Sequence, residues 1–206
     1  MDWDEESRLD VEMFEHLHVE PLDEALANGD EHLVEEVRAH NEGLARLKAR
    51  FADLAASRKT LADNRNWRDA ESRTLRDERQ RIADEGWDAA LAVRTTLRDR
   101  AALLGRLKEH LDSQWSALVT ERSECVAKAS RALSKQHAGY LRTDPVAGQA
   151  YVERLAEADP SVTALDSQMK ALGALIEQVS SALYLAQSDE RATNRRQYEL
   201  HAVMVN

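Results

Sequence analysis

The sequence predicts an all-α protein: a long antiparallel helical hairpin (coiled coil) with a third long C-terminal helix, together forming an elongated bundle. Composition points the same way, because the 206 residues include only 7 glycines and 3 prolines, and 32% of them are charged. A mixture dominated by Ala, Leu, Glu, Asp and Arg is typical of long helices. No stretch alternates apolar and polar residues with β-branched enrichment, so we expect no strands.

The strongest pattern is a seven-residue repeat between residues 33 and 82. Its positions are Leu33, His40, Leu47, Leu54, Leu61, Arg68, Leu75 and Ile82. All of these except His40 and Arg68 are aliphatic. The interleaved positions begin apolar and then turn polar: Val37, Leu44, Phe51, Arg58, Arg65, Ser72 and Arg79. Spacings of three and four residues place side chains on one helix face, which predicts a coiled-coil seam.

A turn near residue 86 is predicted to close the hairpin over residues 31–138. Gly86 is the residue type usually found just past a helix end, and Asp88 can cap the next helix. A second repeat follows: Ala90, Leu97, Leu104, Leu111, Leu118, Cys125 and Ala132. Folding back at Gly86 pairs Leu54 with Leu118, and Leu61 with Leu111. A turn at residues 63–66 is the alternative, because Asp and Asn side chains compete for backbone hydrogen bonds.

The remaining segments flank this hairpin. Residues 1–30 form an acidic leader with a short amphipathic helix, interrupted at Glu20-Pro21, and Asp30 is predicted to cap the first long helix. Residues 139–160 are expected to be a linker with a short helix over 149–157. Residues 161–206 form the third long helix, with Asp159 capping it and Pro160 in its first turn. Its apolar stripe is the most regular in the chain: Val162, Leu165, Met169, Leu172, Ile176, Val179, Leu183 and Ala186.

Charge is distributed unevenly along the chain, whose net charge is −10. Residues 1–36 contain 14 acids and a single arginine, yet the leader also has an apolar face. Both features together predict reversible docking on a basic, partly apolar groove of its own hairpin or of another protein. Arginines in the seam leave the first helix underpacked for a two-helix contact. We therefore expect a third helix or a second chain to pack against it. The candidate interaction residues are therefore Leu9, Met13, Phe14, Leu17, Arg58, Arg65 and Arg79.

We predict no catalytic, cofactor-binding or metal-binding residues, and hence no enzyme. His32, Glu36 and His40 lie on one helix line, but a dinuclear site in a bundle needs two Glu-x-x-His motifs, so surface pairing is expected. Cys125 occupies an apolar position of the second repeat and is expected to be a buried, inert thiol. No Gly-rich phosphate loop or serine nucleophile elbow is present.

The charge pattern and the lack of long apolar runs bear on nucleic-acid binding and on localisation. The arginines from Arg58 to Arg106 are interleaved with acids, which predicts a salt-bridged helix face and no nucleic-acid site. A single cysteine, the absence of a signal peptide and the lack of an apolar run of ~20 residues predict a cytoplasmic protein.

In organisation the chain is loosely similar to the phage-shock-protein A and ESCRT-III group, through its leader, the Glu20-Pro21 break, the long hairpin and Trp67. The resemblance implies a membrane-associated remodelling coiled coil. The leader departs from that pattern, because anionic lipid would repel its acids. We therefore expect a non-enzymatic assembly, scaffolding or adaptor module, with a protein partner or self-association. Membrane remodelling is the second possibility, and an all-helical enzyme is the third.

Overall fold

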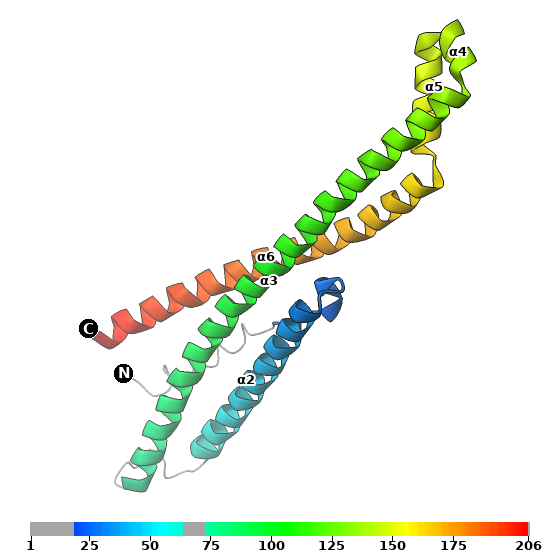
Figure 1. Ribbon diagram of the computed structural model, residues 1–206. Coiled ribbons are helices and arrows are strands. Elements are labelled where there is room, and N and C mark those ends of the chain that lie inside the picture. The colour runs from blue at the N-terminus through cyan, green and yellow to red at the C-terminus, as the bar shows by residue number, and fades with distance from the viewer. Residues whose placement is uncertain (1–18, 64–72, 206) are drawn as a thin grey trace. The chain divides into compact units, whose positions relative to one another are not determined.

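A computed structural model describes residues 19–63 and 73–205, and it confirms the all-α prediction over these ranges (Figure 1). Every regular element in them is a helix. The elements are the 3-10 turn η1 (Glu24–Ala27) and the helices α2 (Glu31–Asp63), α3 (Arg73–Gln136), α4 (Ala138–Thr143), α5 (Pro145–Glu157) and α6 (Pro160–Val205).

The chain divides into two compact units. Unit 1 comprises Met1–Gly105 and Ser181–Asn206, and unit 2 comprises Arg106–Ser180. The long helices α3 and α6 each contribute residues to both units. Each unit is therefore described by its own contacts.

The predicted turn near residue 86 is wrong. Helix α3 continues through residues 84–88, and Gly86 is buried within it. A glycine inside a helix costs only about 1 kcal/mol relative to alanine. That cost is offset by burial of Ile82, Ala89 and Val93 on the same helix. Helix α2 instead ends at Asp63, at the alternative site, and residues 64–72 lie outside the described residues.

Helices α2 and α3 pack in a different register from the predicted one. Within unit 1 they run in opposite directions (Figure 1), and Arg50 donates to the backbone oxygen of Glu85 at 3.5 Å. Leu54 belongs to a buried cluster with residues of both helices, so its predicted partnership with Leu118 is also wrong. The cluster comprises Val19, Leu44, Leu47, Phe51, Leu54, Ala89, Val93 and Leu97. The side chain of Leu61 lies outside the described residues.

The segment before α2 is tied to that helix by polar contacts. The backbone of Leu22 and the side chain of Asn41 exchange two hydrogen bonds, each of 2.8 Å. Lys48 Nζ donates to the backbone oxygen of Val19 at 2.9 Å. Asp30 Oδ1 accepts from the Leu33 backbone N–H at 3.0 Å, which confirms the predicted cap. The chain turns directly before this cap, since Gly29 has a φ of +87°, a conformation that glycine adopts readily.

Unit 2 is built on an antiparallel contact between α3 and α6. The Arg122 guanidinium pairs with the Asp166 carboxylate, with Nη2 to Oδ2 at 3.3 Å. The Trp115 ring lies against Gly173, where an added Cβ would be 3.3 Å from Cζ3. Trp115 and Arg122 lie one heptad apart on α3, and Asp166 and Gly173 lie one heptad apart on α6. The two contacts therefore follow the same spacing in opposite chain directions. The apolar stripe predicted for α6 faces inward, since each of its members is buried or half-buried.

The predicted linker over residues 139–160 contains two helices, α4 and α5. Helix α5 begins earlier than predicted, at Pro145, because Asp144 caps it by accepting from the Ala147 backbone N–H at 3.0 Å. The two helices approach closely: a Cβ at Gly148 would lie 3.0 Å from the Cα of Leu141. Helix α6 begins as predicted, since Asp159 Oδ1 accepts from the Ser161 backbone N–H at 2.9 Å.

Leu44→Ala should destabilise unit 1 by about 2–5 kcal/mol, because this side chain is 1% exposed within the α2–α3 cluster. The free energy of unfolding in urea measures the change. Leu91→Ala is the matched control, since Leu91 is 49% exposed on α3 and should change stability by less than about 0.5 kcal/mol. Equal effects of the two substitutions would contradict the register.

Gly148→Ala should destabilise unit 2, because the new methyl group would collide with the backbone of Leu141. Gly139→Ala on α4 is the control: nothing lies within 4 Å of its added Cβ, so alanine should be neutral or stabilising by up to about 1 kcal/mol. Thermal unfolding followed by circular dichroism distinguishes the two. A more stable Gly148→Ala variant would show that α4 and α5 do not approach in this way.

Candidate functional site

Most of the predicted interaction residues cannot be assigned contacts. Leu9, Met13, Phe14, Leu17 and Arg65 lie outside the described residues. Arg58 lies on α2 and Arg79 on α3, but their side chains are outside the described part as well. Docking of the leader therefore stays a prediction. The described side chains supply two other features, a buried polar cluster in unit 1 and an aromatic surface in unit 2.

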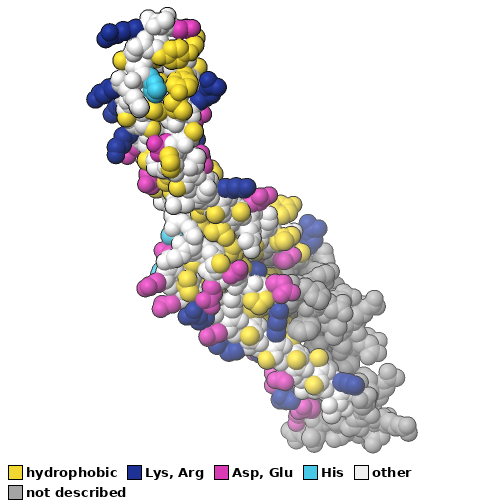
Figure 2. Space-filling view, turned by 90° about the vertical axis from the view of Figure 1, so that its right-hand side faces the viewer, with side chains coloured by type: hydrophobic (Ala, Val, Ile, Leu, Met, Phe, Trp, Pro, Cys, Tyr) yellow, Lys and Arg dark blue, Asp and Glu magenta, His cyan; other side chains and the backbone are white. Residues whose placement is uncertain are grey.

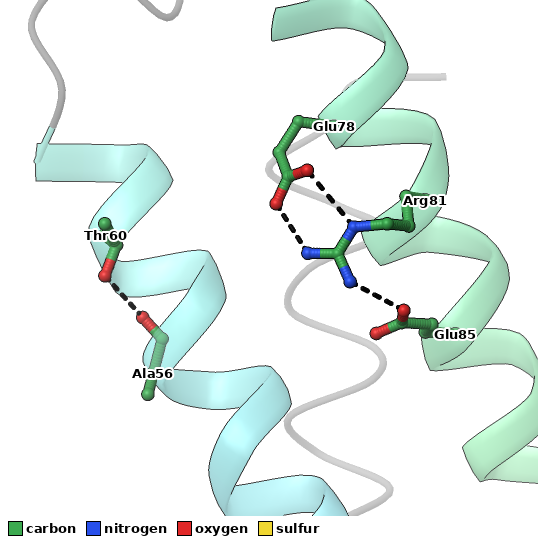
Figure 3. Close-up of polar contacts among 5 residues, drawn as sticks. All are labelled: Ala56, Thr60, Glu78, Arg81 and Glu85. Carbon is green, nitrogen blue, oxygen red and sulfur yellow. Dashed lines mark hydrogen bonds and ion pairs between the residues drawn. The ribbon is translucent and has the colours of Figure 1, made fainter.

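Arg81 illustrates how the arginine-rich part of α3 balances its charge (Figure 3). Its guanidinium donates to Glu78 at 2.6 and 3.1 Å, and to Glu85 at 2.7 Å. These hydrogen bonds lower the pKa of the Glu78 carboxyl and raise that of the Arg81 guanidinium. Both partners lie on the same helix and are exposed to water, so the pairs contribute little to stability. The predicted salt-bridged face is confirmed at this arginine.

A buried polar cluster, formed by His40 on α2 and Arg100 on α3, lies in the interior of unit 1, where the charge of Arg100 acts on His40. His40 Nε2 on α2, Arg100 Nη1 on α3 and Asn194 Oδ1 on α6 are buried, and none has a hydrogen-bond partner among the described residues. The Arg100 side chain is almost fully buried. Such unpaired atoms each cost about 1–3 kcal/mol, so the helices tolerate strain where these atoms are buried.

The charges around this cluster set its protonation. Desolvation lowers the pKa of His40, and the positive charge of Arg100 lowers it further, whereas Asp99 acts in the opposite direction. Desolvation also lowers the pKa of Arg100, opposed by Asp189 and Glu20. At neutral pH the cluster therefore holds a neutral imidazole near a charged guanidinium. Uptake of a proton by His40 would place two like charges in the interior.

The histidine line predicted from the sequence separates into two environments. His32 Nε2 lies 3.2 Å from Glu36 Oε1 on the surface of α2, as expected for surface pairing, whereas His40 points into the interior. Within the described residues, no group of three His, Cys, Asp or Glu side chains is arranged to hold a metal ion.

The prediction that Cys125 is buried is wrong, because its side chain is half-buried. Its position in the second repeat was read as facing the first long helix. Because α3 continues past Gly86, Cys125 lies in unit 2, where its helix packs against α6. Leu118, one heptad earlier, is likewise only half-buried.

A cluster of aromatic rings lies where α3, α4 and α5 meet in unit 2. The Tyr151 ring stands edge-to-face with His137, at a centroid distance of 5.3 Å, and with Tyr140, at 5.9 Å. Tyr140 is 47% exposed, and Val146 is 83% exposed. Figure 2 shows hydrophobic side chains gathered over this part of the molecule next to a histidine, with basic side chains beside them. Large exposed aromatic groups in contact with one another are typical of an interaction site.

The charge of the same region is unlike that of the rest of the chain. Between Glu124 and Asp144 there is no acidic residue. The run contains four basic residues, all exposed: Lys128, Arg131, Lys135 and Arg142. We call the region formed by these four residues with His137, Tyr140 and Tyr151 the basic aromatic end; the exposed Val146 follows it at the start of α5.

The basic aromatic end is not predicted from the sequence, because residues 139–160 are expected to be a linker with one short helix. The signal was nevertheless present. Asp144-Pro145 repeats the Asp-Pro pattern of Asp159-Pro160, which was correctly read as a helix start. The acid-free run was equally visible, but net charges summed over longer segments concealed it.

Exposed apolar side chains also occur in unit 1. Trp87 and Leu91 lie one helical turn apart on α3, and Tyr184 and Leu185 are neighbours on α6, where they are 73% and 60% exposed. No run of like charge surrounds these pairs. Around Trp87 and Leu91, for example, the acidic Asp88 and the basic Arg94 both lie nearby in the sequence. They therefore offer less charge selectivity than the basic aromatic end.

Comparison with known protein families, curated proteins and solved structures finds no match to this chain. Within the described residues, no helix combines the length and apolar character needed to cross a membrane. The function must therefore be argued from the chemistry of the surfaces above.

Acidification should destabilise unit 1 through His40. Its folded-state pKa lies below the ordinary value of 6.5, so the unfolded chain binds a proton at a higher pH than the folded chain does. The stability contributed by the neutral imidazole is complete above about pH 6.5 and is lost as pH falls through the folded-state pKa.

Urea unfolding of the wild type and of His40→Gln, measured between pH 7.5 and pH 5 (about the window in which an unperturbed histidine titrates), isolates this contribution. The variant should lose less stability on acidification than the wild type. His32→Gln, at the exposed pair with Glu36, is the control and should retain the wild-type slope. Identical slopes for wild type and His40→Gln would rule out a titrating interior imidazole.

Proposed function

We propose that this protein is a non-enzymatic helical interaction module, acting in the cytoplasm in assembly, scaffolding or adaptation by binding protein surfaces. The observation that carries the proposal is the basic aromatic end. It combines exposed Tyr140 and Tyr151 with four exposed basic residues. Tyrosine and arginine are the residue types enriched where protein interfaces contribute most affinity.

The long helices suit this role as spacers. In unit 2 the contacts Trp115–Gly173 and Arg122–Asp166 follow the heptad spacing of an antiparallel coiled coil. We propose that α3 pairs in this way with α6 there and with α2 in unit 1. A helix pair of this kind presents the α4–α5 connection as a rigid recognition element.

The charge pattern favours an acidic protein partner. Basic side chains around an apolar centre steer acidic segments toward the surface and reject basic ones. Enzymatic function and membrane remodelling remain the less favoured classes, since no described cluster points to a reaction and the leader is acidic.

Crosslinking and affinity capture from the native cell, read by mass spectrometry, test the function. The tagged wild type should capture at least one protein, or another copy of itself, and the double variant Tyr140→Ser/Tyr151→Ser should lose it by about tenfold, as expected for interface tyrosines that together contribute more than ~1.4 kcal/mol. Tyr184→Ser on α6 is the matched control, since it removes an exposed tyrosine elsewhere.

The control should retain the captured protein, and circular dichroism should show unchanged helicity for all variants. Capture by the double variant equal to that by the wild type would contradict the assignment of the site. No captured protein above an untagged background would contradict the function.

A further inference from the structure

We propose that the basic aromatic end binds the acidic leader, residues 1–18, of a second copy of this chain. The inference rests on the proposed function and names its partner. It follows from matching two surfaces of opposite chemistry, one described by the structure and the other given by the sequence.

Charge is the first part of the match. Residues 1–18 contain seven acids and one basic residue, Arg8. The run between Glu124 and Asp144 contains four basic residues and no acid, in a chain with 38 acids in total. The run is the longest acid-free stretch of this chain, and both segments also carry large apolar groups. Attraction between them raises the rate of encounter and sets the orientation.

Apolar contact is the second part of the match. The leader has Leu9, Met13 and Leu17 at four-residue spacing, so a helix formed on docking would present them on one face. Tyr140 and Tyr151, which contact each other edge-to-face, supply the exposed apolar surface against which this face would be buried. A helix that orders as it binds requires such burial to offset its loss of conformational entropy.

Several arginines elsewhere in the described part of the chain are poorer receptors for the leader. Arg81 is already paired with Glu78 and Glu85, and Arg38 is paired with Glu24. Arg100 is buried. The arginine-rich part of α3 therefore offers mixed charge, whereas the part of the basic aromatic end between Glu124 and Asp144 contains basic residues and no acid.

A second copy fits the site better than a nucleic acid or an anionic membrane. The chain carries a net charge of −10, so an extended polyanionic surface would repel most of it. A single acidic segment meets only the basic aromatic end. Each chain carries one leader and one such end, so two chains can exchange leaders and form two identical contacts, as in a twofold-symmetric dimer.

Charge-swapped full-length chains test the proposal. One variant reverses the leader, Glu12→Lys/Glu15→Lys, and the other reverses the basic aromatic end, Lys135→Glu/Arg142→Glu. Sedimentation velocity of the wild type should show association that weakens between about 0.05 and 0.5 M salt, because exposed charges are screened. Each variant alone should associate about tenfold more weakly, since two pairs become repulsive.

An equimolar mixture of the two variants decides whether the contact is between chains. The reversed leader then meets the reversed end, and the wild-type leader meets the wild-type end, so the mixture should regain association that neither variant shows alone. Matched charge reversals on α2, Glu31→Lys/Glu35→Lys, serve as a control that should leave the association unchanged.

Several results would overturn the inference while leaving the proposed function intact. These are a wild type that captures other proteins but is monomeric, association that survives both reversals, and a mixture that fails to recover. Loss of binding to phosphatidylserine vesicles or to single-stranded DNA on reversal of Lys135 and Arg142, with no effect on self-association, would assign the end to that anionic partner. Failure of the capture experiment as well would remove the proposed function itself.

Discussion

The structure depends on covering the apolar stripe of α3. This helix is 64 residues long, and a single helix cannot keep such a stripe in water. In unit 1 the stripe packs against α2, through Val93 and Leu97. In unit 2 the same helix packs against α6, at Trp115 and Arg122. Within each unit a partner helix thus covers apolar residues of α3, and the basic aromatic end follows in unit 2 where α3 terminates.

Local signals in the sequence predicted local structure well. Asp30 and Asp159 cap the helices that they were predicted to cap, because a cap requires only the side chain and the next few backbone N–H groups. The stripe from Val162 to Ala186 was correct because its residues share one helix face whichever partner covers them. The same reasoning explains why helix type was predictable throughout the described ranges.

The fold-back was not predictable because it depends on two distant stripes. A repeat of seven residues aligns with another in many registers, and Gly86 favoured the wrong one. A glycine penalty of about 1 kcal/mol is small beside the burial of several aliphatic side chains at about 1.5–3 kcal/mol each. The competing signal, Asp63 and the asparagines after it, was recognised but ranked second. Misplacing the fold-back then misassigned the environments of Leu118 and Cys125.

The candidate site was partly visible in the sequence. Uneven charge was recognised at the leader, yet the complementary acid-free run was divided between a predicted helix and a predicted linker. Only the close approach of α4 and α5 at Gly148 brings Tyr140 and Tyr151 together. The buried pair of His40 and Arg100 was not predictable, because its members come from separate helices.

The continuity of α3 is the claim on which the remaining assignments rest, and amide hydrogen exchange tests it most directly. Residues 84–88 lie inside the helix, so their backbone amides should exchange slowly, with protection comparable to that of residues 93–97. Rapid exchange at residues 84–88, with protection on both sides, would place a turn there and contradict the account.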